Sequence, residues 1–216
     1  MDNKKNLGIL TGPNLISCIG TLHPQDHDDL THCTQIATRS ADMVSSRFDA
    51  STRWLHEYMT TMDFLGWSVF KDSIFSRTTH ILSKSVADFL VLSAQTMSNA
   101  QQGNAMIDTL DALKPDQPAL LSLDKESLEG KRFQVIPASY DAKGFLEIAV
   151  FNLEVVAYTK KNSFLFHEWE EAGIKVIQHR AILKLDRYKF ETKSALIEKK
   201  RSEIIMKRFD LYKQQK

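Results

Sequence analysis

FLEIAVFNLEVVAY, at positions 145–158, has the pattern of a strand that is apolar on both faces. Only Glu147, Asn152 and Glu154 interrupt the apolar residues. Strands of this kind lie in the interior of a sheet, because neither face meets water. The stretch therefore predicts a long central strand.

Shorter alternating segments lie on both sides of this stretch in the sequence. Phe133, Val135 and Pro137 alternate with polar residues, and residues 141–144 form a turn signal. The remaining connections are also only a few residues long, which suits hairpins and is too short for parallel crossovers. We expect an antiparallel meander of about four strands, at residues 133–137, 145–158, 163–169 and 174–185.

The first half of the chain has a helical period instead. Apolar residues recur every three or four positions from Ile36 to Leu65, which predicts one long amphipathic helix that ends at Gly66. Ser85 and Asp88 form a capping box for a second helix over residues 85–113, bent near Gly103. Residues 67–82 fit one or two short strands or an irregular connection.

These elements predict an α+β protein that folds as a single domain, residues 1–216. Two long amphipathic helices pack on the meander, and a basic helix over residues 187–216 closes the fold. We divide the chain into a loop-rich segment at 1–35, a helical half at 36–114, and a sheet with its terminal helix at 131–216. Residues 115–130 are turn-rich and mark the boundary.

Composition limits the function classes. Twenty-eight Lys and Arg against 27 Asp and Glu give a net charge of +1, so no overall field attracts nucleic acid. No uninterrupted apolar run reaches the length of a membrane-spanning helix. Two cysteines, Cys18 and Cys33, are too few for a disulfide framework and fit a reducing compartment. We expect a cytoplasmic protein, or one exported without a cleavable signal peptide.

Three histidines near the N-terminus form a candidate metal site. His23, His27 and His32 lie among aspartates, and imidazole and carboxylate are both zinc ligands. The spacing of His27 and His32 is one residue too long for one face of a helix. The alternative is that these histidines are solvated or cap a helix, and no cofactor is then expected.

An aromatic group and a basic group are candidate partner sites. Trp54, Tyr58 and Trp67 lie near the end of the first helix and would either pack in the core or line a pocket for a partner. The predicted terminal helix has ten Lys or Arg and four Asp or Glu. Its candidate binding surface, for lipid phosphates, nucleic acid or an acidic partner, consists of Lys199, Lys200, Arg201, Lys207 and Arg208. The favoured alternative is a solvated helix whose charges offset the negative charge of the preceding chain.

The sequence has no nucleophile elbow and no phosphate-binding glycine loop, which favours a protein without enzymatic activity. The leading hypothesis is a binding or protein-interaction domain, with a protein partner or self-association. A second hypothesis is a membrane-active toxin or effector that binds lipid through amphipathic helices. A third is a metal-dependent hydrolase built on the three histidines.

Overall fold

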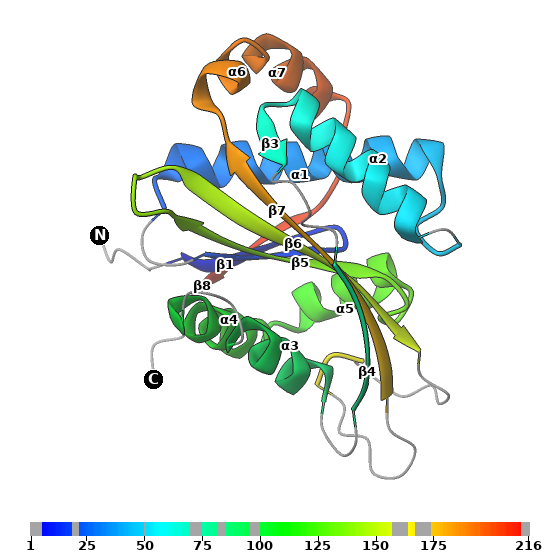
Figure 1. The fold of residues 1–216 in the computed structure, drawn as a ribbon. Coiled ribbons are helices and arrows are strands. Elements are labelled where there is room, and N and C mark those ends of the chain that lie inside the picture. Colours follow the sequence, from blue (N-terminus) through cyan, green and yellow to red (C-terminus); the bar gives the residue numbers. More distant parts are fainter. Residues whose placement is uncertain are drawn as a thin grey trace.

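The computed structural model describes residues 6–18, 22–49, 51–69, 75–81, 85–95, 100–156, 164–166 and 174–212. These residues form one mixed sheet with helices on both of its faces (Figure 1). The mixed α+β class predicted from the sequence is confirmed, whereas the predicted arrangement of the elements is not.

The sheet has eight strands among the described residues. Seven of them follow the order β3-β7-β6-β5-β2-β1-β8, and β4 pairs with β7 beside β3. The neighbours pair antiparallel except β2 and β5, which are parallel. The strands are β1 (Asn6–Thr11), β2 (Asn14–Cys18), β3 (Trp67–Val69), β4 (Phe75–Ile81), β5 (Phe133–Tyr140), β6 (Leu146–Val156), β7 (Ile174–Leu185) and β8 (Arg208–Tyr212).

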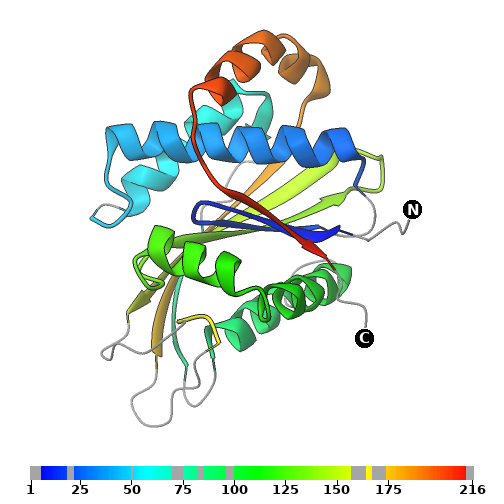
Figure 2. The same cartoon turned by 180° about the vertical axis from the view of Figure 1, so that it is seen from behind.

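Two helical layers cover the sheet (Figures 1 and 2). On one face lie α1 (Pro24–Val44) and α2 (Ser51–Phe64), with α6 (Arg187–Glu191) and α7 (Ser194–Ser202) beside them. On the other face lie α3 (Val86–Gln95), α4 (Ala100–Leu113) and α5 (Gln117–Ser127). The central strand β6 contributes to both cores: Ile148 and Val150 pack under α1 and α2, and Phe151 and Leu153 pack under α3 to α5.

The predicted helix over residues 36–65 is wrong in one respect, because it is two helices. Its apolar spacing continues past residue 44, where α1 ends; residues 47–49 form a turn, and α2 packs back against α1. Likewise α3 and α4 are separate helices, and Gly103 lies inside α4 rather than at a bend. Residues 115–130, predicted as turns, contain α5, whose N-cap Asp116 accepts a hydrogen bond from the Ala119 amide at 3.0 Å.

Both ends of the chain also differ from the prediction. The segment 1–35, expected to be loops, contains the β1–β2 hairpin and the first half of α1. The single basic helix over 187–216 is instead α6, α7 and the edge strand β8, which pairs with β1.

The predicted four-stranded meander is part of a larger mixed sheet. Strands β5, β6 and β7 confirm three of its four members; in the fourth, residues 164–166 form a turn and the rest lie outside the described residues.

Gly66 ends α2 with φ +102°, as its position after the helix predicts. A Cβ atom there would lie 2.7 Å from the backbone nitrogen of Phe190 and 2.9 Å from its Cα. Gly144 also has a positive φ, of +81°, but a Cβ there meets nothing within 4 Å. An alanine at Gly144 would therefore introduce backbone strain alone, whereas an alanine at Gly66 would introduce both backbone strain and steric overlap.

We predict that Gly144→Ala lowers the free energy of unfolding by about 1–2 kcal/mol, the cost of a left-handed non-glycine residue. Gly66→Ala should cost about 1–3 kcal/mol more, because the α2 end and α6 must also move apart. Urea denaturation of both variants measures the difference. Equal losses would show that the close approach of Gly66 to Phe190 does not constrain the fold.

Candidate functional site

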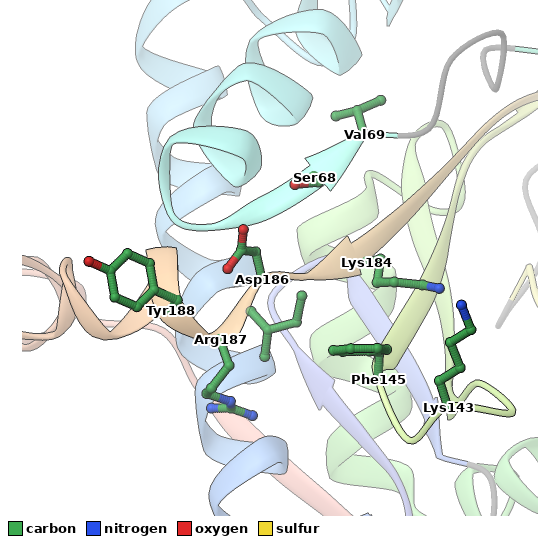
Figure 3. Close-up of a pocket in the computed structure, with 9 residues that line it drawn as sticks. Ser68, Val69, Lys143, Phe145, Lys184, Asp186, Arg187 and Tyr188 are labelled. Atoms are coloured by element: carbon green, nitrogen blue, oxygen red, sulfur yellow. The ribbon is translucent and has the colours of Figure 1, made fainter.

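A cavity of about 550 Å³ opens at one end of the sheet, and we call it the rim pocket (Figure 3). Three segments meet there: the edge strand β3, the turn between β5 and β6, and the junction of β7 with α6. The lining residues are Ser68, Val69, Lys143, Phe145, Lys184, Leu185, Asp186, Arg187 and Tyr188.

The turn between β5 and β6 places Phe145 at the pocket. The Asp141 carboxylate accepts hydrogen bonds from the backbone nitrogens of Lys143 at 2.8 Å and Phe145 at 2.9 Å. The same carboxylate accepts a hydrogen bond from Lys184. The bond from Lys184, followed by those from the backbone of Phe145 and Lys143, holds the pKa of Asp141 below its ordinary value. The side chain of Phe145 remains 49% exposed at the pocket.

The opposite side of the pocket is built by the start of α6. Asp186 caps this helix by accepting from the Lys189 amide at 3.1 Å, and its own amide donates to the Gly66 carbonyl at 2.8 Å. Tyr188 follows in the first turn and is 79% exposed. Leu185, which is buried, also lines the pocket. The pocket therefore combines two exposed aromatic side chains with an apolar lining residue from the end of β7.

The two cations deepest in this region are already paired. Lys184 contacts Asp141, and it lies 3.9 Å from Glu147. Arg187 bonds Asp26 and Asp29, the latter at 2.5 Å. Burial alone would lower the pKa of Arg187, but the contacts with Asp29 and Asp26 outweigh burial and raise it. These pairs leave little net positive charge at the pocket.

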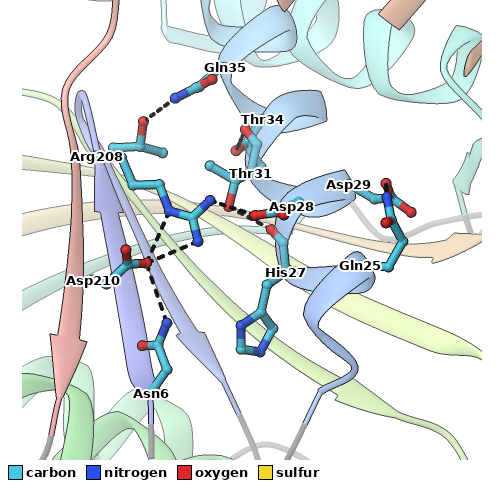
Figure 4. A network of polar contacts seen from close by, with 11 residues as sticks. Asn6, Gln25, His27, Asp28, Asp29, Thr31, Thr34, Gln35, Arg208 and Asp210 are labelled. Carbon is cyan, nitrogen blue, oxygen red and sulfur yellow. Dashed lines mark hydrogen bonds and ion pairs between the residues drawn. The ribbon is translucent and has the colours of Figure 1, made fainter. Parts of the chain in front are cut away.

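A second polar network joins α1 to the other edge of the sheet (Figure 4). Arg208 of β8 bonds Asp28 at 2.6 Å and Asp210 at 3.0 Å. Farther along α1, the Gln35 amide donates to Thr11 at 2.7 Å. Because hydrogen bonds are directional, these contacts fix the position of α1 along the sheet.

The three predicted metal ligands lie along α1 without forming a site. His23 is the N-cap, and its Nδ1 accepts from the Gln25 amide at 3.3 Å. This is the helix-capping role named as the alternative. Among the described residues, no group of three His, Cys, Asp or Glu side chains is arranged to hold a metal ion. The described residues thus give no geometric support to the metal-dependent hydrolase.

The predicted aromatic group lies in the interior. Trp54, Tyr58 and Trp67 are fully buried in the core under α1 and α2, and the rings of Trp54 and Tyr58 stack 5.3 Å apart. The Trp54 indole donates to Asp42 at 2.8 Å. A partner could reach these rings only if α1 and α2 separated from the sheet.

The predicted basic surface is divided among α7, β8 and the segment that joins them. Lys199, Lys200 and Arg201 end α7, where Lys200 lies 3.6 Å from Glu203 and Arg201 lies 3.4 Å from Glu198. Arg208 belongs to the network on β8, and Lys207 precedes it. Acidic neighbours thus pair with three of the five cations, and the five do not form one basic face of a helix.

The rim pocket was missed by the sequence analysis. Its turn was predicted at residues 141–144, but Phe145 was assigned to the following strand and not to a surface. Tyr188 lies outside the apolar stripe of the predicted tail helix. An aromatic residue immediately after a turn was the available signal.

No family model matches the chain, and no curated protein matches its sequence. Two solved structures have a similar arrangement. The first is titled "DELTA-ENDOTOXIN", with a TM-score of 0.49 and 10% identity over 82% of this chain and 84% of that chain. The second is titled "Structure of the Evf virulence factor", with a TM-score of 0.39 and 8% identity over 94% of this chain and 83% of that chain. Similarities this low do not bear on function.

We predict that stability falls as the pH drops below 6.5, because burial lowers the pKa of His27 and His32 below that ordinary value. The unfolded chain then binds protons that the folded chain does not, so stability is full above 6.5 and declines beneath it. The double variant His27→Gln with His32→Gln should flatten this slope between pH 6.5 and 5, as measured by urea denaturation. His56→Gln, at an exposed position, is the control. An unchanged slope in the double variant would contradict the prediction.

Proposed function

We propose that this protein is a membrane-active effector that binds the lipid interface through the rim pocket. The observation that supports this proposal is the pair of exposed rings, Phe145 and Tyr188, which line one pocket together with the apolar Val69 and Leu185. Aromatic side chains with apolar surroundings are favoured at the boundary between headgroups and acyl chains. No described helix is long and apolar enough to cross a bilayer.

The geometry of the pocket suits shallow insertion. Phe145 is carried by a tight turn, Tyr188 by the first turn of α6, and Val69 by an edge strand. All three are exposed ends of elements whose other parts pack in the core. They can therefore enter a lipid surface without any loss of internal packing.

Charge pairing predicts which lipids are bound. Lys184 and Arg187 already contact carboxylates, so a lipid phosphate would have to displace those contacts. Lys143 lines the pocket and is exposed. One such cation contributes only about 1 kcal/mol near an anionic surface. We therefore expect apolar insertion to dominate, with similar binding to neutral and anionic membranes and weak dependence on salt.

The experiment is co-sedimentation with phosphatidylcholine vesicles, and with vesicles that also contain phosphatidylserine, at low and high salt. The double variant Phe145→Ser with Tyr188→Ser should lower the partition coefficient by more than about tenfold, since burying a large apolar side chain contributes about 1.5–3 kcal/mol. The matched control is Met43→Ser with Phe64→Ser, which removes two exposed apolar side chains from α1 and α2.

The two variants separate the rim pocket from the helix surfaces predicted from the sequence. Loss of binding in the control, with none in the Phe145 and Tyr188 variant, would place the lipid contact on the amphipathic helices. Absence of the wild-type protein from every vesicle pellet would refute membrane binding. Binding to phosphatidylserine vesicles alone, abolished by salt, would refute insertion as its cause.

A further inference from the structure

A second and larger cavity, of about 1070 Å³, lies between α1, α5 and the segment that joins α7 to β8. We call it the α1–α5 groove. Figure 2 shows the joining segment crossing α1 and descending past α5 into β8. Met206 of this segment packs against Gly12. A Cβ atom added to that glycine would lie only 2.7 Å from the Met206 sulfur. The volume is at the upper limit for small-molecule pockets and suits a polypeptide segment better.

The groove exposes large apolar side chains from two of its walls. Leu121 of α5 is 66% exposed, and Ile205 of the joining segment is fully exposed. Pro118 completes the apolar part of the α5 wall. Covering such side chains with a partner favours binding, by about 25 cal/mol for each Å² of apolar surface buried.

Charges in the groove are unbalanced, in contrast to those at the rim pocket. Arg47 pairs with Asp42 at 2.6 Å, so these two lining residues neutralise each other. Arg39, Lys125 and Lys207 also line the groove, are exposed, and form no ion pair with any described residue.

The groove's acidic residues do not offset those three cations. Glu203 is 3.6 Å from Lys200, which leaves Glu126 as the acidic lining residue without an ion pair among the described residues. The remaining charge of the groove is therefore positive.

We propose that the α1–α5 groove binds a partner protein through an acidic, amphipathic helix. Such a helix would place leucine-like side chains against Leu121 and Ile205 and its carboxylates near Lys125 and Lys207. Helices commonly bind in grooves with apolar anchors at three- and four-residue spacing. Nucleic acid fits less well, because the cations are few and two exposed apolar side chains lie among them.

The test uses three synthetic helical peptides and the full chain. The first has glutamate on one face and leucine on the other, the second has glutamine in place of glutamate, and the third has serine in place of leucine. Fluorescence anisotropy measures the Kd of each. We expect the first peptide to bind on the order of tenfold more tightly than either of the others at low salt. At high salt it should lose its advantage over the glutamine peptide and keep its advantage over the serine peptide.

Charge reversal locates the site. Lys125→Glu with Lys207→Glu should weaken binding of the acidic peptide on the order of tenfold and leave binding of the glutamine peptide unaffected. The matched control, Arg53→Glu with Lys199→Glu, makes the same change of charge at exposed positions outside the groove. Thermal unfolding of both variants checks that each is folded.

Several results would overturn the proposal. Equal Kd values for the three peptides would remove its chemical basis, and equal losses in both charge-reversed variants would show a non-specific effect of net charge. If Lys125→Glu with Lys207→Glu abolished binding to phosphatidylserine vesicles and not to the peptide, the groove would be a lipid surface. Because the vesicle variants leave the groove unchanged, membrane binding and peptide binding can each fail independently.

Discussion

Burial of β6 on both faces is the constraint on which the fold depends. Ile148 and Val150 face one helical layer, and Phe151 and Leu153 face the other, so neither layer can be absent without exposing apolar surface. The helices of each layer need little apolar character of their own beyond one stripe. This leaves α1 free to bury polar side chains such as Gln35 and Thr38, which bond to the β1–β2 hairpin instead of packing in an apolar interface.

Elements with strong local periods could be predicted from the sequence, and elements defined by distant partners could not. The predicted strands over 145–158 and 174–185 correspond to β6 and β7, because both stretches are long and rich in apolar residues. The break between α1 and α2 was missed because the apolar stripe continues through residues 45–50. Strand β8 was missed because its five residues are too few for a pattern of their own and form a strand only by pairing with β1, almost two hundred residues away. The parallel pairing of β2 with β5 has no local signal at all.

The candidate sites were harder to predict because they depend on which charges are paired. From the sequence, Arg208 is part of a basic cluster; in the fold it lies between Asp28 and Asp210, which no nearby sequence pattern indicates. Arg187 similarly bonds two carboxylates about 160 positions earlier. Composition gives the number of cations but not the number that remain available to a ligand. The helix-capping role of His23 could be foreseen, because it depends only on the residues that follow it.

Binding at the rim pocket and binding in the α1–α5 groove would depend on different interactions. At the rim pocket Lys184 and Arg187 have internal partners, so contact there would depend mainly on apolar area, which salt does not screen. In the α1–α5 groove, Lys125 and Lys207 have none among the described residues, so contact there has a component that salt weakens. Helix α1 connects the surfaces, because its first turns bond Arg187 at the rim and its last turns line the groove. Its hydrogen bonds to the β1–β2 hairpin hold it in position on the sheet, so the separation between the rim pocket and the α1–α5 groove is set by one helix.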